Sequence, residues 1–356
     1  MTLYEFSIPM PYEIKYIDKV LDVNNSVKKS KITSFYFGLP PSNELYTGFE
    51  QCRNKNIEHK DFEYWRNLME YSVKNGIDVI YCLNHPNPFN QSIEEYGRNE
   101  KKLQILLDKL YAIGIDKLRV ANPSLMIQIW TRYREFKIYA STSLEYKTIQ
   151  EYQNFMMMYP YTIQIVPSHD INKNFKLLAA IKKSLPAVEV ELMATQACLR
   201  GCPHRTEHQS NKSYGMKFCF SLYQKNAALN ICKANNIYPW DVEEYSKLGI
   251  NKFKLVGRDS FPEKTDTLIH NYHLYMSGID DYKNIENESI NAFIHFIPAG
   301  QYFPDNIKVK DIKPLLPEIE YFKQRGFLCA SDCRTECMYC YECASNINKM
   351  IKKKIN

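Results

Sequence analysis

Residues 113–122 read IGIDKLRVAN, and two other stretches share this pattern: NGIDVIYCLN at residues 75–84 and GINKFKLVGR at residues 249–258. In each of the three, a glycine and an isoleucine precede a short, mostly apolar run. Glycine suits the left-handed position just beyond the C-terminus of a helix. A run rich in Val, Ile, Leu, Phe and Tyr is typical of a buried strand. Each stretch therefore predicts a helix followed by a strand of a parallel sheet.

Eight strands of this kind can be placed along the chain, with helical patterns between them. The expected strands are residues 3–7, 34–37, 78–83, 117–121, 137–140, 162–166, 188–193 and 252–256. The expected helices are residues 13–22, 61–75, 95–113, 123–133, 145–158, 171–184 and 240–248. This alternation predicts the α/β class and, within it, a TIM-like (β/α)8 barrel with a cysteine-rich C-terminal extension. An open doubly wound sheet is the alternative, and the lack of a G-x-G-x-x-G motif after the first strand counts against it.

The composition is that of an ordinary globular protein. Of the 356 residues, 45% are hydrophobic and 24% are charged, which excludes a disordered chain. No apolar run approaches the ~18 residues of a membrane span, and the first ten residues lack the features of a secretion signal. We therefore expect no membrane span and a cytoplasmic location. The net charge of +6 permits an anionic partner such as RNA without requiring one.

The cysteines carry most of the functional information. There are 11 of them, an odd and clustered set, which indicates metal binding rather than a disulfide framework. Four of them follow the seventh expected strand, on the face where barrel enzymes act: Cys198, Cys202, Cys219 and Cys232. Four thiolates suit a [4Fe–4S] cluster or Zn²⁺. The C-x₃-C spacing favours the cluster, and buried cysteines without a metal are the alternative.

A second group of cysteines lies near the C-terminus, within 15 residues of sequence. Its members are Cys329, Cys333, Cys337, Cys340 and Cys343. We expect them to bind metal, either as a second [4Fe–4S] cluster or as Zn²⁺. The stretch from Cys333 to Cys340 has the C-x₃-C-x-aromatic-C form of a radical-SAM signature. That motif normally follows the first barrel strand, and no barrel can follow it here, so we favour a closed auxiliary site.

Polar residues also follow several expected strands, as at the mouth of a barrel. They are Asn84, His85, Asn122, Ser141, Thr142, Ser168, His169, Thr195, Gln196, Arg258 and Asp259. Singly, such residues more often cap a loop or helix than perform catalysis. The sequence has no G-x-S-x-G, HExxH, P-loop or EF-hand motif.

Two segments give a family resemblance. Glu191 followed by Ala197-Cys198 and Cys202, and then the stretch FKLVGR at residues 253–258, resembles the signature of the peptidase U32 family. The closest branch is that of the iron–sulfur, ubiquinone-hydroxylating proteins. The chain departs from the common pattern at Thr195-Gln196, where that family usually has His-Gly. The resemblance covers roughly residues 1–260.

The resemblance implies a TIM-like barrel that carries a [4Fe–4S] cluster on the four cysteines from Cys198 to Cys232. Studied members are oxygen-independent hydroxylases of RNA bases or quinone precursors, and some use prephenate as the oxygen donor. Others were described as collagenases. The implied organisation is a barrel with an iron–sulfur site over residues 1–260, a linker and extension over 261–327, and a cysteine-rich metal-binding module over 328–356.

We therefore expect an iron–sulfur enzyme that modifies a small molecule, an RNA base or a peptide by redox chemistry. The candidate catalytic residues are Arg258, Lys254, Glu191 and His208. Arg258 and Lys254 would hold an anionic donor or substrate, and a structural ion pair is the alternative for both. Two other functions stay open: a U32-type peptidase, and a non-catalytic iron–sulfur subunit that serves a protein partner.

Overall fold

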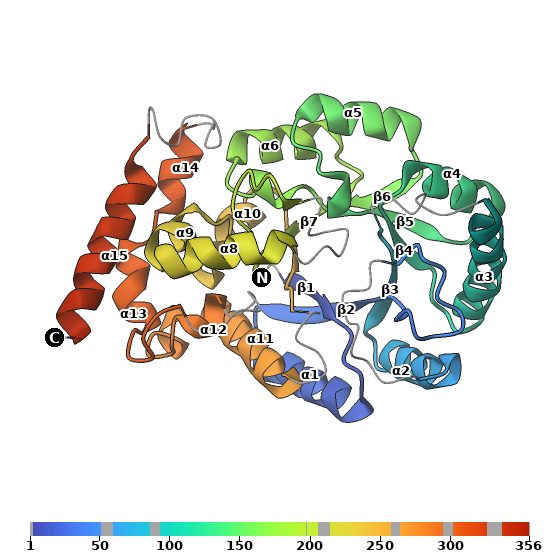
Figure 1. The fold of residues 1–356 in the computed structure, drawn as a ribbon, viewed down its shortest axis with the longest axis horizontal. Coiled ribbons are helices and arrows are strands. Elements are labelled where there is room, and N and C mark those ends of the chain that lie inside the picture. The colour runs from blue at the N-terminus through green and yellow to red at the C-terminus, as the bar shows by residue number, and fades with distance from the viewer. Residues whose placement is uncertain are drawn as a thin grey trace.

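The computed structural model describes residues 3–50, 60–85, 93–196, 198–205, 214–257, 264–294, 302–325 and 337–355. Eight parallel strands close into a barrel in sequence order, with β8 beside β1 (Figure 1). The strands are β1 (Tyr4–Pro9), β2 (Ser30–Phe37), β3 (Asp78–Leu83), β4 (Lys117–Val120), β5 (Lys137–Ala140), β6 (Thr162–Ile165), β7 (Glu189–Met193) and β8 (Lys252–Lys254). The predicted TIM-like (β/α)8 barrel is confirmed.

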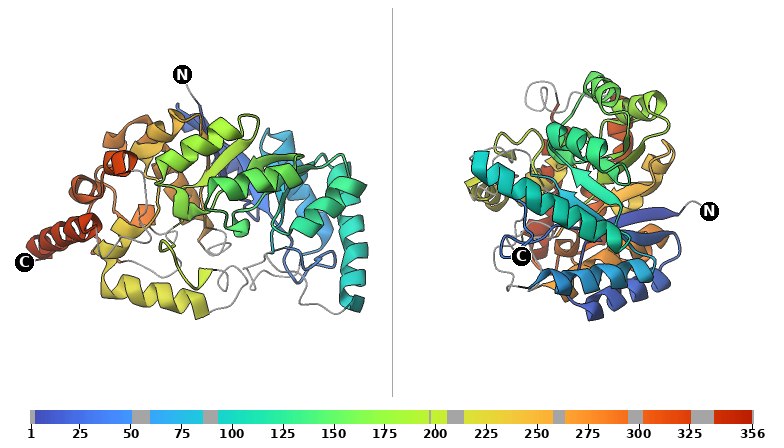
Figure 2. Two further views of the ribbon diagram at one scale, coloured as in Figure 1. Left: turned by 90° about the horizontal axis from the view of Figure 1, so that it is seen from above. Right: turned by 90° about the vertical axis from the view of Figure 1, so that its right-hand side faces the viewer.

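Helices surround this barrel as a ring (Figure 1). The ring contains α1 (Ile14–Ser26), α2 (Phe62–Lys74), α3 (Ile93–Ala112), α4 (Pro123–Arg132), α5 (Ile149–Met158), α6 (Phe175–Ser184), α10 (Val242–Ser246) and α11 (Thr265–Asp280). Further helices lie to one side of it: α8 (Tyr214–Lys225), α9 (Ala227–Lys233), α12 (Asn291–Ile294), α13 (Val309–Ile312), α14 (Ile319–Arg325) and α15 (Tyr339–Ile355). Helix α15 lies at the end of the molecule opposite α3 (Figure 2).

Each of the three glycine–isoleucine stretches ends a helix and leads into a strand, as its sequence predicts. Each glycine has a positive φ, at 76°, 83° and 75° for Gly76, Gly114 and Gly249. The amide that follows each glycine donates to a carbonyl five residues earlier, as when Ile115 bonds to Leu110 over 3.0 Å. This pattern ends a helix with its last carbonyls satisfied. The chain then enters β3, β4 or β8 directly.

Helix α11 is the last helix of the ring. It packs against α1 and β2, so the end of the barrel region is joined to its beginning. The backbone amides of Lys28 and Lys29 donate to the carboxylate of Asp280 over 2.8 and 2.7 Å. The segment 261–327, expected to be a linker and extension, therefore begins with a helix that belongs to the ring.

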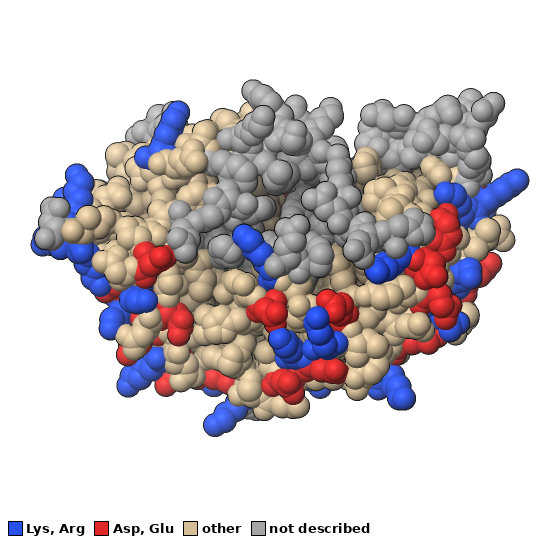
Figure 3. All heavy atoms as spheres, turned by 60° about the horizontal axis from the view of Figure 1, so that its bottom comes forward, with Lys and Arg blue, Asp and Glu red and all other residues tan. Residues whose placement is uncertain are grey.

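Charged residues of both signs share the surface. On the face shown in Figure 3, Lys and Arg side chains are interspersed with Asp and Glu. Ion pairs of this kind include Lys252 with Glu189 over 2.9 Å and Lys323 with Glu244 over 2.7 Å. None of the helices among the described residues is long and apolar enough to cross a membrane.

Candidate functional site

Three of the predicted cysteines meet at the carboxyl end of the barrel. Cys198 and Cys202 lie in the loop that follows β7, and Cys219 lies on α8. The thiol of Cys202 is within hydrogen-bonding reach of both other thiols. Cys198 is buried and the other two are partly buried. The structure thus gathers three soft sulfur donors where barrel enzymes bind their substrates.

The thiols of Cys202 and Cys219 have pKa values shifted in opposite directions. The hydrogen bond with Cys202 lowers the pKa of Cys219, and this effect outweighs the burial that opposes it. The hydrogen bond with Cys198 lowers the pKa of Cys202, but the bond with Cys219 and burial together raise it above its ordinary value. Of these two thiols, Cys219 is the one whose local contacts favour the thiolate. A thiolate is the form that binds a metal.

Arg205 holds the cysteine loop in place and brings a positive charge to it. Its Nη1 donates to Glu145 Oε2 over 2.9 Å, and its Nη2 donates to Asp170 Oδ1 over 2.6 Å and to the carbonyl of Leu199 over 2.9 Å. The side chain is 5% exposed. Its charge acts on Cys198 and also lowers the pKa of Cys219. A buried guanidinium beside thiols stabilises their anionic form.

The two carboxylates that hold Arg205 stand on the loops after β5 and β6. Burial alone would raise the pKa of Asp170, but the hydrogen bond and charge of Arg205 outweigh it and hold that pKa well below its usual range. The same balance lowers the pKa of Glu145. Glu145 has a φ of 55°, a left-handed conformation that is rare outside glycine. Loops from three consecutive strands are therefore joined by one charge cluster.

A histidine stands beside this charge cluster. His169 is 2% exposed and lies within electrostatic reach of both Glu145 and Asp170. Its Nε2 atom has no hydrogen-bond partner among the described residues. A buried ring nitrogen at the carboxyl end of β6 is suited to hold a polar group of a ligand.

Cys232 lies apart from the other three cysteines. It is fully buried on α9, and Cys340 Sγ approaches its carbonyl oxygen to 3.5 Å. Burial first, and then the charges of Cys340 and Cys343, raise the pKa of its thiol. The cause of this placement is that α9 packs along α15. The structure thus places the fourth expected ligand with the C-terminal cysteines instead of with Cys202.

Lys254 and Glu191 lie at different levels of the barrel, two residues apart along neighbouring strands. Lys254 ends β8, pairs with Met193 at the end of β7, and is 7% exposed. Its Nζ lies 3.7 Å from the centre of the Tyr36 ring. Glu191 forms an ion pair of 2.6 Å with Arg119 inside the barrel. It lines a cavity of about 40 Å³ together with the first residues of several strands, so it faces the amino end.

Some predicted site residues fall outside the described residues. They are Arg258, His208, Cys329 and Cys333. Among the described residues, no set of three or more His, Cys, Asp and Glu side chains is already arranged around a metal position.

None of Arg205, Asp170 and Glu145 is predicted as a site residue from the sequence. Each is an ordinary charged residue in a loop until the barrel brings the three loops together. The one signal in the sequence is the position of Arg205, three residues after Cys202. A cation so close to expected thiolate ligands has a clear electrostatic use.

Comparisons with known proteins give distant similarities in structure alone. No protein-family model and no curated protein matches the chain significantly. Among solved structures, the U32 peptidase Mk0906 is similar at 13% identity and a TM-score of 0.46, covering 72% of this chain and 92% of that one. CdNal from Clostridium difficile, in complex with mannosamine, is similar at 10% identity and a TM-score of 0.40, covering 99% of each chain. N-acetylneuraminate lyase from Fusobacterium nucleatum is similar at 10% identity and a TM-score of 0.37, covering 99% and 98%. These values are low, so the assignment of the barrel rests on the strand order of this chain itself.

Proposed function

We propose that the protein is an iron–sulfur enzyme whose reaction centre lies at the carboxyl end of the barrel. Cys198, Cys202 and Cys219 would hold the cluster. The observation that carries this proposal is the contact among these three thiols beside the buried guanidinium of Arg205. Thiolates are the ligands that iron–sulfur clusters take, and a nearby cation offsets the negative charge of such a centre.

A [4Fe–4S] cluster with three protein thiolates supplies electron transfer and one iron that is open to a ligand. The residues around the three thiols are suited to binding that ligand. Lys254 brings a buried ammonium to the end of β8, next to the strand from which the cysteine loop starts. His169 brings a buried ring nitrogen at the end of β6. Together these groups favour a substrate or oxygen donor with acidic or polar groups.

The proposed reaction is an oxygen-independent hydroxylation or a related redox modification. The substrate would be a small molecule such as a quinone precursor, an RNA base or a peptide. The resemblance of the Cys198 and FKLVGR segments to the hydroxylating branch of the U32 family supports this class of reaction. The mixed surface charge shown in Figure 3 gives no preference for RNA on that face, so a small molecule is the first substrate to test.

The decisive experiment measures iron and sulfide in protein purified without oxygen. We expect about four iron and four sulfide ions per chain at this centre. Cys202→Ser should lose most of both, together with the visible absorption of the cluster. Cys82→Ser is the matched control, because Cys82 is a buried cysteine of β3 that is 1% exposed and bonds to the carbonyl of Ile80. Unchanged iron in Cys202→Ser, or no iron in the wild-type protein, would reject the proposal.

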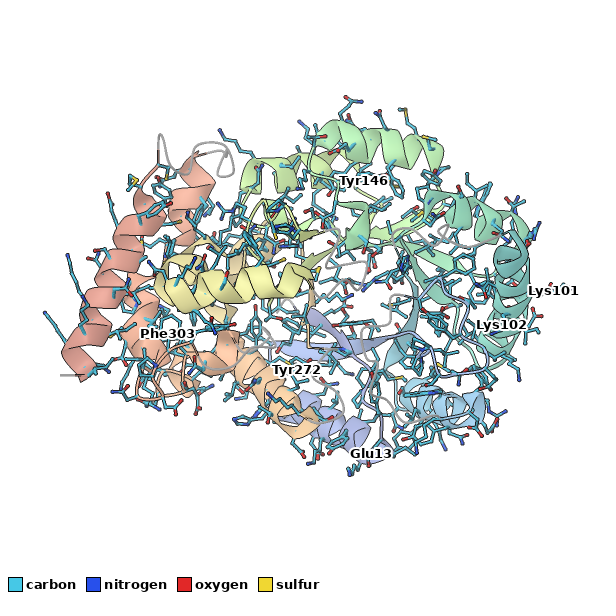
Figure 4. The ribbon with its side chains drawn as sticks, viewed as in Figure 1. Glu13, Lys101, Lys102, Tyr146, Tyr272 and Phe303 are labelled. Atoms are coloured by element: carbon cyan, nitrogen blue, oxygen red, sulfur yellow. The ribbon has the colours of Figure 1, made fainter. Side chains whose placement is uncertain are left out.

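A second experiment tests the binding role of Lys254. Prephenate, an acidic small molecule, serves as the probe in calorimetric titrations. Lys254→Gln should keep its iron and bind prephenate about tenfold or more weakly, because hydrogen bonds to charged groups contribute about 1.5–3 kcal/mol. Lys101→Gln is the control, since Lys101 is exposed on α3 at the outer edge of the ring (Figure 4). Equal affinities in both variants would remove Lys254 from the site.

The same preparations separate the two other functions. Peptide hydrolysis by metal-free protein that is abolished in Cys202→Ser would establish a peptidase. An electron-carrying subunit would be established by two results together. The iron-containing chain would be isolated in a stoichiometric complex with a second protein, and the chain alone would show no turnover.

A further inference from the structure

Three cysteines from two distant parts of the chain lie close together where α15 packs on α9, and a fourth stands three residues before one of them in the sequence. Helix α15 begins at Tyr339, and its first turn carries Cys340 and Cys343, which share one face at a spacing of three residues. Both are buried, at 4% and 9% exposure, and Cys232 is fully buried. The Sγ atom of Cys340 lies 3.5 Å from the carbonyl oxygen of Cys232. The charges of Cys340 and Cys343 both act on the Cys232 thiol, so the three are near neighbours.

The fourth cysteine stands just before the helix. Cys337 is 9% exposed, and its Sγ lies 3.2 Å from the hydroxyl of Tyr321 on α14. The ring of Tyr321 stacks on that of Tyr339, with 3.9 Å between the ring centres. These contacts hold Cys337 and the first residue of α15 against α14. The spacing from Cys337 to Cys340 is C-x₂-C, which is common among zinc ligands.

A buried ammonium faces this group of cysteines. Lys173 is 6% exposed, and its Nζ donates to the carbonyl of Ala234 over 2.9 Å. Its charge acts on Cys340 and Cys232, and also on Asp241. Within the described part of the chain, Lys173 forms no ion pair with a carboxylate. Burying a charge is costly unless an opposite charge lies nearby.

Packing of neutral thiols does not account for this arrangement. Single buried cysteines behave as small apolar residues and need no partner. Here three thiols from α9 and α15 lie close together beside a buried ammonium that forms no ion pair among the described residues. Four thiolates around a divalent metal carry a net negative charge, which would act on Lys173 together with the nearby carboxylate of Asp241.

We infer that Cys232, Cys337, Cys340 and Cys343 form a closed four-thiolate site for Zn²⁺ that fastens α15 to α9. The contact of Cys340 Sγ with the Cys232 carbonyl brings the two helices together at these residues, and all four cysteines are at most 9% exposed, as is typical of structural zinc. As at the Cys202 group, the thiols are not already arranged around a metal position. Binding replaces four S–H bonds with four Zn–S bonds and releases the protons to solvent, so no electron transfer is involved. The inference does not depend on the proposed function.

Metal analysis of the full chain tests the inference. Protein purified with zinc present should carry about one zinc ion per chain, bound by four sulfur atoms at about 2.3 Å in X-ray absorption spectra. Cys232→Ser and Cys340→Ser should each lose at least half of the zinc and keep the iron of the Cys202 centre. Cys82→Ser should keep both metals. Circular dichroism confirms that each variant is folded.

Several results would overturn the inference, and each is distinct from failure of the proposed function. An unchanged zinc content in Cys232→Ser would overturn it. So would the absence of zinc from the wild-type protein, or a zinc ion bound by fewer than four sulfur atoms. Iron that is lost in Cys232→Ser would assign this cysteine to the other centre. Loss of iron in Cys202→Ser tests the proposed function alone.

Hydrogen exchange gives a second readout that does not depend on any variant. Removal of zinc by a chelator should speed amide exchange in α15 and α9 at least tenfold, because the link between them is lost. Exchange in α4, on the far side of the ring, should stay the same. Equal rates in α15 with and without the chelator would contradict the fastening role.

Discussion

Arg205 and Asp170 are 35 residues apart in sequence, and their side chains meet over 2.6 Å between Nη2 and Oδ1. This pair joins the cysteine loop after β7 to the loop after β6. Because Glu145 holds the other nitrogen of the same guanidinium, the loop after β5 is joined as well. The cysteine loop is therefore positioned by charge pairing with its neighbours in the barrel.

Arg205→Gln should lower the free energy of unfolding by about 3–5 kcal/mol, because it leaves two largely buried carboxylates without their buried cation and with only the more exposed Lys147 beside them. Lys147→Gln is the matched control. Lys147 lies 2.9 Å from the same Asp170, but its side chain is 45% exposed, so its loss should cost at most about 1 kcal/mol. Urea unfolding of the two variants makes the comparison. Similar losses of unfolding free energy in both variants would show that burial of the ion pair between Arg205 and Asp170 adds no stability.

The stability of the protein should fall in acid, partly through Asp170. Its pKa is lower in the folded protein than its ordinary value of 3.8, so the unfolded chain binds the proton more readily. The stabilisation is therefore fully present well above pH 3.8 and is lost progressively as the pH falls below it toward the lower pKa of the folded protein. Asp170→Asn should flatten this acid decline in thermal unfolding measured from pH 6 to pH 2. Asn in place of the exposed Asp22 should leave the decline unchanged, and an unchanged decline in Asp170→Asn would refute the assignment.

The pair of Arg119 and Glu191 should behave as a structural unit of the barrel. Either Arg119→Met or Glu191→Leu alone should cost about 3–5 kcal/mol, since each leaves a charge buried and unpaired. The double variant should cost clearly less than the sum of the two, because no charge then remains. Urea unfolding of the four proteins completes the cycle. Additive costs would mean that the ion pair at 2.6 Å does not couple the two residues.

Gly257 should tolerate alanine less well than Gly114 does. Both have positive φ, at 141° and 83°, so alanine strains the backbone at either site. A Cβ on Gly114 meets nothing within 4 Å, whereas one on Gly257 would lie 2.7 Å from the Tyr272 hydroxyl and 2.9 Å from Leu268 Cδ2. Tyr272, which is labelled in Figure 4, reaches from α11, and its hydroxyl donates to the carbonyl of Val256 over 3.0 Å. We expect Gly257→Ala to cost at least about 1 kcal/mol more than Gly114→Ala in urea unfolding. Equal costs would show that Tyr272 and Leu268 move away freely.

The barrel could be predicted from the sequence because its signals are local. A glycine that ends a helix and an apolar run that follows it lie within ten residues, as in the stretch 113–122. The helix at 265–280 was not predicted, because its buried residues contact both α1 and β2 and so cover more than one face.

The site was only partly predictable, because its contacts join distant residues. The grouping of Cys198 with Cys202 follows from their spacing, and the position of Cys219 follows from its nearness to them in sequence. The separation of Cys232 depends on a helix that begins more than 100 residues later, and spacing carries no information about such packing. The same holds for Arg205, whose partners stand on other loops.

The pairing of β8 with β1 has a consequence for how the chain is made. Until residue 254 has been synthesised, β1 and β7 are both open edges of an incomplete sheet, and such edges pair readily with other chains. The last helix of the ring ends at Asp280, which binds the backbone before β2. About three quarters of the protein must therefore leave the ribosome before these edges are covered, so this is a chain for which chaperones that shield nascent strands should matter.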